Sequence, residues 1–153
     1  MCGRIGLIDR PHCCRFRAGT FDRLSRLALL LQPGGLSDPI KVVFAKGLTA
    51  FREGDFYLTH DLWEEAWHNY RHRDRKFLQG LIHIAVGCYH LQCRNAKGAH
   101  SQLGKAIDKI TPFGPQHWGI NVTRVLDVVS QLRDENFDST GLFDKLQAVR
   151  EAL

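Results

Sequence analysis

The 153-residue sequence lacks the features that define several large classes of protein. It has no low-complexity stretch, and its composition (44% apolar, 24% charged) is typical of a globular chain, not of a disordered or collagen-like one. It contains five cysteines, an odd number, and two of them, Cys13 and Cys14, are adjacent. Because a chain of this length can bury a core without covalent crosslinks, these features exclude a secreted disulfide scaffold.

Motifs for common chemistries are also missing. The sequence has no GxSxG, P-loop or GxGxxG motif, so no motif supports nucleophilic acyl transfer or nucleotide binding. No run of alternating β-branched residues lies between turn signals, so strands are not expected. The longest uncharged stretch, residues 77–93, is shorter than the ~20 residues that span a membrane. With no signal peptide or membrane span in the sequence, we expect a cytoplasmic protein that does not contact membranes.

The positive charge is concentrated at one end of the chain. Of the net charge of +5, residues 1–36 account for most, with six arginines against two aspartates, whereas residues 37–153 are nearly neutral. A nucleic-acid-binding protein concentrates cations on its folded domain or on an extended arm, and the nearly neutral folded part argues against such binding. We predict a basic, loosely ordered extension over residues 1–36, with a short helix near 21–31, and a single helical domain over 37–153.

Residues 37–153 predict an all-α fold, a compact bundle of five to six helices. Five of the helices are expected to begin at a capping residue, namely Asp38, Asp74, Asn95, Asn121, and Asp138 or Ser139. The expected helices cover about 39–53, 56–70, 75–93, 95–111, 122–133 and 139–153. The third of these is apolar around almost its whole circumference, so we predict that it is the buried centre of the bundle.

The few polar residues of this central helix fall on one line. At 3.6 residues per turn, Gln79, His83 and His90 lie within about 40° of one another. Buried imidazole and amide groups cost free energy unless something hydrogen-bonds or ligates them. Another helix is therefore expected to present partners to this line.

The second helix has a candidate partner. Its expected core-facing stripe is Phe56, His60, Trp63, Trp67 and Tyr70, at intervals of four, three, four and three. His60 lies in the middle of this stripe, and Glu64 follows it by one turn.

Histidines and a carboxylate that converge from two helices are typical of a divalent-metal site. The candidate metal ligands are His60, Glu64, His83 and His90. Glu64 could also act as a general base on a bound water, and Gln79 could orient water or substrate. The corresponding hypothesis is a metal-dependent hydrolase of a small-molecule substrate, with neither the substrate nor the metal specified by the sequence.

Other polar residues are expected to serve the surface or the packing. Asp61 and Glu65 point about 100° or more away from the centre of the stripe, which predicts solvated side chains or pairs with Arg71, Arg73 or Arg75. His117 has no spacing that marks it, and a surface position is expected. The tryptophans are interpreted as packing residues.

A second hypothesis needs no metal. The same histidines and Glu64 could form a buried polar network that specifies how the helices pack. The protein would then be a non-enzymatic helical module that acts through a partner or as a homo-oligomer.

Several segments together resemble a known family. They are residues 51–67 (FREGDFYLTHDLWEEAW), 77–85 (FLQGLIHIA), His90 and 95–99 (NAKGA). In combination they resemble DUF309, a family of small bacterial and archaeal proteins, over about residues 40–110. The resemblance implies a compact helical bundle with these motifs facing inward. The family has no established biochemical function and is commonly labelled a predicted metal-dependent hydrolase. Asp61 stands where the family pattern usually has Glu.

Overall fold

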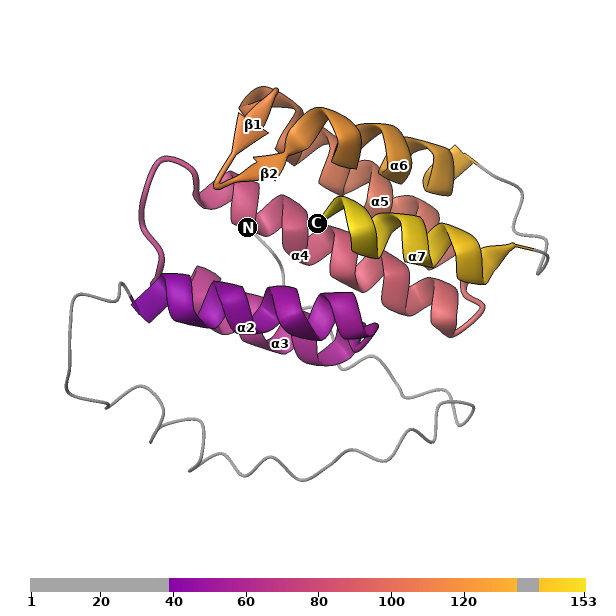
Figure 1. Cartoon of the computed structure of the whole chain (residues 1–153), viewed down its shortest axis with the longest axis horizontal. Coiled ribbons are helices and arrows are strands. Elements are labelled where there is room, and N and C mark those ends of the chain that lie inside the picture. Colours follow the sequence, from indigo (N-terminus) through magenta and orange to yellow (C-terminus); the bar gives the residue numbers. More distant parts are fainter. Residues whose placement is uncertain (1–38, 135–140) are drawn as a thin grey trace. The chain divides into compact units, whose positions relative to one another are not determined.

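The described part of the chain is helical, as the capping and helix-ending residues in the sequence predict. The structure is a computed structural model that describes residues 39–134 and 141–153, so the predicted extension over 1–36 lies outside the described residues. Within them the chain forms six α-helices (Figure 1). These are α2 (Pro39–Glu53), α3 (Phe56–Asn69), α4 (Arg75–Gln92), α5 (Ala96–Ile110), α6 (Val122–Asp134) and α7 (Leu142–Ala152). The all-α prediction is confirmed.

Local chemistry sets most of the helix boundaries. Gly54 ends α2 with φ of +85°, a left-handed conformation that glycine adopts at little cost. The side chain of Asp55 accepts a hydrogen bond from Leu58 N at 3.0 Å and so caps α3. Asn95 caps α5 in the same way, through Gly98 N at 2.9 Å.

Asp74 precedes α4 as predicted, but its side chain does not cap the helix. Its carboxylate instead accepts hydrogen bonds from the Tyr70 hydroxyl (2.6 Å), Trp118 Nε1 (2.7 Å) and His117 Nε2 (3.2 Å). The expected cap is wrong because side-chain donors from the preceding turn and from the distant hairpin segment compete successfully for this carboxylate. The surface position expected for His117 is also wrong, because this side chain is only 25% exposed.

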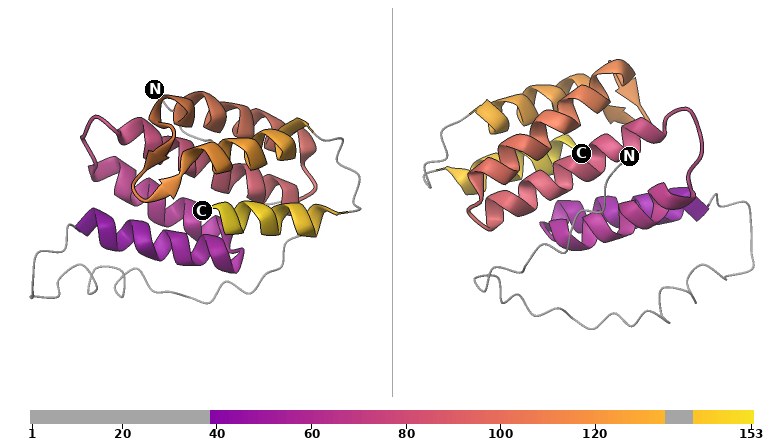
Figure 2. Two further views of the ribbon diagram at one scale, coloured as in Figure 1. Left: turned by 45° about the horizontal axis from the view of Figure 1, so that its top comes forward. Right: turned by 180° about the vertical axis from the view of Figure 1, so that it is seen from behind.

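The central helix is α4, again as predicted. It packs against α3 on one side and α5 on the other, while α2 packs on α3 and α6 on α5 (Figures 1 and 2). Twelve of its eighteen residues are buried. Two of them are glycines that let α5 approach closely: a Cβ at Gly80 would lie 2.4 Å from Ile110 Cγ1, and one at Gly87 would lie 2.6 Å from Leu103 Cδ2.

A small hairpin corrects the expectation that the chain has no strands. After the short 3₁₀ helix η1 (Thr111–Phe113), β1 (Gln116–His117) pairs antiparallel with β2 (Ile120–Asn121). The two turn residues, Trp118 and Gly119, both have positive φ, which is the geometry of a tight hairpin turn. Strands of two residues are too short to produce an alternating pattern, so periodicity could not reveal them.

None of the helices in residues 39–134 and 141–153 has both the length and the apolar character that a membrane span requires.

Candidate functional site

The buried face of α3 is rotated from the predicted one. The buried residues of α3 are Phe56, Thr59, Trp63 and Ala66. Thr59 can be buried because its hydroxyl donates to Asp55 O at 2.8 Å, which satisfies the polar group locally. His60 therefore lies at the edge of the core-facing stripe and not at its centre, with 20% of its side chain exposed.

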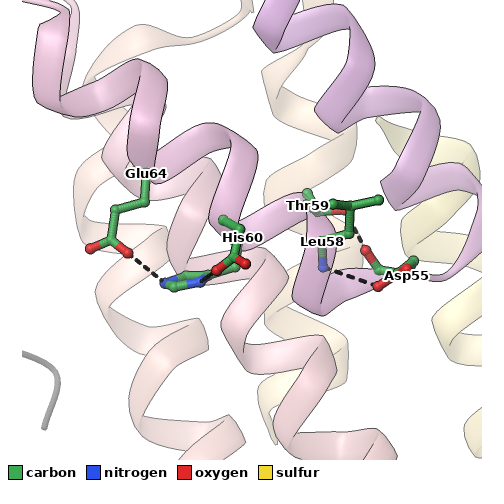
Figure 3. Close-up of polar contacts among 6 residues, drawn as sticks. Asp55, Leu58, Thr59, His60 and Glu64 are labelled. Atoms are coloured by element: carbon green, nitrogen blue, oxygen red, sulfur yellow. Dashed lines mark hydrogen bonds and ion pairs between the residues drawn. The ribbon is translucent and has the colours of Figure 1, made fainter. Parts of the chain in front are cut away.

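His60 is held between two carboxylates (Figure 3). Its Nε2 lies 3.3 Å from Glu64 Oε2, one turn further along α3, and its Nδ1 lies 3.4 Å from Asp61 Oδ1. The side chains of Glu64 and Asp61 are 38% and 30% exposed. The predicted contact between His60 and Glu64 is therefore present. The solvated role expected for Asp61 is wrong, because its carboxylate contacts His60, whereas Glu65 is exposed as expected.

His83 is buried on α4, with only 5% of its surface exposed. Its Nδ1 lies 2.8 Å from Oε1 of Gln102 on α5. Because an amide oxygen can only accept, Nδ1 carries the proton and Nε2 keeps its lone pair. In the described residues, the hydrogen bond of the His83 ring is made through Nδ1 and not through Nε2.

Electrostatics keep His83 neutral. Burial lowers its pKa below the ordinary 6.5, an effect that the hydrogen bond to Gln102 opposes. The positive charges of Lys109 and Lys105 on α5 lower the pKa further, and so does the electrostatic interaction of His83 with His60 on α3. His60 and His83 thus come from neighbouring helices and are close enough to affect one another electrostatically. A neutral imidazole is the form that binds metals or acts as a base.

Gln79 lies on α4 one helical turn before His83 and is partly buried. It keeps the position on the polar line that its spacing predicts. No described contact of Gln79 establishes a role in water or substrate orientation, so that role stays a prediction.

His90 belongs to a different arrangement. It lies seven residues after His83, about 10 Å further along the axis of α4. Asn95 Nδ2 donates to its Nδ1 at 3.2 Å, while Oδ1 of the same asparagine caps α5. Burial lowers the pKa of His90, so its neutral form can accept this bond. The structure thus uses His90 in the turn from α4 to α5, away from His60 and His83.

The predicted resemblance was tested against models of known families. Residues 44–102 match the family model described as "Domain of unknown function (DUF309)". We call these matched residues the DUF309 segment. The match confirms the predicted resemblance, and it contains every candidate site residue, although the family description assigns no activity. No curated protein and no solved structure matches the chain.

In residues 39–134 and 141–153, no three or more His, Cys, Asp and Glu side chains are grouped so that they could hold a metal ion. The close pair on α3 is His60 with Glu64, and His83 approaches this pair from α4 without completing such a group.

Residues of α5 near His83 were missed by the sequence reasoning. They are Gln102, which binds Nδ1 of His83, and the two lysines, Lys105 and Lys109. Their spacing along α5 places them on one flank of the buried stripe Ala99, Leu103, Ala106 and Ile110. The spacing of the apolar residues in the sequence is enough to show that these three residues lie beside the buried stripe. Which neighbour the flank faces depends on how α4 and α5 pack.

Proposed function

We propose that the DUF309 segment is a metal-dependent hydrolase whose divalent metal is held by His60, Glu64 and His83. The observation that carries the proposal is the state of the two histidines. Each engages Nδ1 with an oxygen acceptor, Asp61 for His60 and Gln102 for His83. Metal-binding histidines have this arrangement, in which an acceptor on one ring nitrogen orients the lone pair of the other toward the metal.

The distance between His60 and Glu64 supports the same reading. Adjacent ligands at bond lengths of about 2.1 Å lie roughly 3.0–3.4 Å apart in octahedral or tetrahedral sites. The 3.3 Å between His60 Nε2 and Glu64 Oε2 falls within this range. Partial exposure of both side chains leaves them accessible to a metal and to solvent.

His83 is the proposed third ligand. Its lowered pKa keeps Nε2 unprotonated near neutral pH, as ligation requires. Because the three side chains do not yet form a compact group in the described structure, ligation needs a side-chain rotation that brings His83 and the α3 pair together. We leave His90 out of this set, since its Nδ1 already accepts a bond from Asn95.

The remaining polar residues would support the chemistry. When bound, a divalent ion lowers the pKa of a water molecule toward ~7 and polarises a carbonyl or phosphoryl oxygen. Asp61 would hold the ring of His60 in its ligating orientation. Gln79 would orient water or substrate next to His83. The accessible part of Glu64 would accept a proton from the attacking water.

Metal binding is the direct test. Elemental analysis of protein purified without chelator or affinity tag, followed by titration with Zn²⁺ and Mn²⁺, should show one bound ion per chain. Glu64→Gln and His60→Ala should weaken binding by about tenfold or more, and Asp61→Asn by about 10–100-fold through loss of ligand orientation. Glu65→Gln is the matched control, because Glu65 is the exposed neighbour of Glu64 on α3, and it should bind normally.

Thermal stability gives a readout that is independent of turnover. Metal at about 100 times its dissociation constant should stabilise the wild-type protein by about 2.7 kcal/mol and the Glu64→Gln protein by much less. Equal affinity for metal in the Glu64→Gln and wild-type proteins would overturn the proposal.

A second candidate is favoured by a specific pair of contacts. His83 bonds Gln102 across α4 and α5, and His90 bonds Asn95 in the connecting turn, so both histidines tie the same helix pair together. In this reading the protein is a non-enzymatic helical module that acts through a partner or as a homo-oligomer. It predicts no bound metal, together with loss of stability in His83→Ala and His90→Ala.

A further inference from the structure

One flank of α5 carries two lysines next to the candidate site. Gln102, Lys105 and Lys109 follow one another at three and four residues, which places them along one side of the helix. Gln102 contacts His83 directly. Further along α5, Lys109 Cβ lies 3.3 Å from where a Cβ on Gly80 would be, so the lysine passes directly beside the residue that follows Gln79. Both lysines also act electrostatically on His83, which fits their place on the same flank as Gln102.

These two charges have no acidic partner in the described part of the chain. The ion pairs found there involve His60, His117 and Arg133. Asp108, which lies between the two lysines in sequence, is exposed and instead acts electrostatically on Arg133 of α6. Lys109 is also partly buried, as is usual where the apolar stem of a lysine packs against the protein and its ammonium group reaches solvent.

We infer that Lys105 and Lys109 bind the phosphoryl group of an anionic substrate beside His60, Glu64 and His83. The placement of the reacting bond at these residues rests on the proposed function, but the anion site itself rests on the lysines. An ammonium group is a compact point charge suited to phosphate oxygens, and two of them one turn apart match a doubly charged group. A phosphoryl group also offers enough oxygens to contact the lysines and a divalent ion together.

Binding of inorganic phosphate to the full chain tests this inference. Calorimetric titration should show that Lys105→Ala/Lys109→Ala weakens phosphate binding by about tenfold or more, because charge-assisted hydrogen bonds are lost. Lys105→Arg/Lys109→Arg should stay within about threefold of wild type, since the charges remain. Lys105 is exposed and Lys109 is only partly buried, so the thermal unfolding of each variant should resemble that of wild type.

A matched variant removes the same number of charges elsewhere. Lys41→Ala/Lys97→Ala changes two exposed lysines, one of which lies at the N-terminal end of α5, where backbone N–H groups could hold an anion. It should bind phosphate as wild type does. If this variant loses phosphate and the Lys105/Lys109 variant does not, the anion site is misplaced and the inference fails.

Two further experiments are needed. The first tests whether the ligand is a phosphoryl group, and the second tests the anion site independently of the proposed function. Acetate should bind about tenfold or more weakly than phosphate, and equal affinity would overturn the assignment to a phosphoryl group. The titration is repeated without metal. Lysine-dependent phosphate binding in a protein that binds no metal would uphold the anion site and reject the hydrolase. Normal Zn²⁺ binding together with a phosphate affinity that does not depend on the lysines would uphold the metal site and reject the anion site.

Discussion

The three candidate histidines, His60, His83 and His90, differ in the groups that surround their rings. His60 lies between two carboxylates at the edge of α3, His83 is buried against an amide oxygen, and His90 accepts a bond from an amide nitrogen. For His83 and His90, the acceptor or donor beside the ring decides which nitrogen carries the proton. Only His60 and His83 present an Nε2 that is suited to ligation in their described surroundings.

The contact of His90 with Asn95 explains a glycine in the same turn. A Cβ at Gly98 would lie 2.8 Å from Asn95 Nδ2 and 2.9 Å from His90 Nδ1. We expect Gly98→Ala to destabilise the protein by about 1–3 kcal/mol, because the added methyl group displaces both partners. Urea denaturation measures the change.

Gly104 provides the control within the same helix. The nearest atom to a Cβ at Gly104 is Arg133 Cδ, at 4.0 Å, so alanine fits there. Gly104→Ala should stabilise the protein by about 0.5–1 kcal/mol through helix propensity. If both variants shift stability in the same direction, the steric role of Gly98 is refuted.

At the scale of elements, the site depends on how closely α4 and α5 pack. His83 reaches Gln102 because small residues on α4 remove the side chains that would hold α5 away. Gly87 faces the buried Leu103, whose Cδ2 would lie 2.6 Å from an added Cβ. Leu103 is fully buried and has little room to move, so this contact is tight.

A double-mutant cycle tests this contact. Gly87→Ala alone should cost about 1–3 kcal/mol through overpacking, and Leu103→Ala alone about 2–5 kcal/mol through a cavity. Together they should cost less than the sum by at least about 0.5 kcal/mol, because the added methyl group partly fills the cavity. Val125→Ala on α6 is the reference, and its effect should add to that of Gly87→Ala. Additive effects in both pairs would show that this contact does not limit how closely α4 and α5 pack.

At the scale of the whole molecule, Asp74 connects segments that are far apart in sequence. Its carboxylate joins Tyr70, before α4, to His117 and Trp118 in the hairpin. Burial by itself raises the pKa of Asp74, but the hydrogen bonds from Tyr70, Trp118 and His117 outweigh it and bring the pKa below the ordinary 3.8. The folded protein thus favours the ionised form more than the unfolded chain does.

This difference predicts acid sensitivity. The contribution of Asp74 to the free energy of unfolding is complete above pH 3.8 and is lost as the pH falls through the lower pKa of the folded state. Asp74→Asn should therefore be less stable than wild type at pH 7, and the gap should narrow below about pH 4. Unfolding in urea from pH 7 to pH 2.5 measures it, with Asp127→Asn on the exposed face of α6 as control. A gap that stays constant with pH would contradict this role for the carboxylate.

The helices of this protein could be predicted from sequence because their causes are local. Capping residues such as Asn95, a left-handed glycine at Gly54 and an uncharged central stretch act within a few residues. The approach of His60 to Glu64 is equally local, since one helical turn separates them. These features depend on spacing along a single helix, which the sequence states directly.

Features that involve several elements were decided by the tertiary structure. Thr59, and not His60, is turned into the core because of how α3 is rotated against its neighbours. Likewise, the carboxylate of Asp74 binds donors more than 40 residues away instead of capping α4. Gln102 contacts His83 across a helix interface, and the lysines of α5 act on His83 electrostatically. The physical reason is that amphipathic spacing orients a helix only to within a broad face, whereas hydrogen bonds and metal ligation require positions set to a fraction of an ångström by packing.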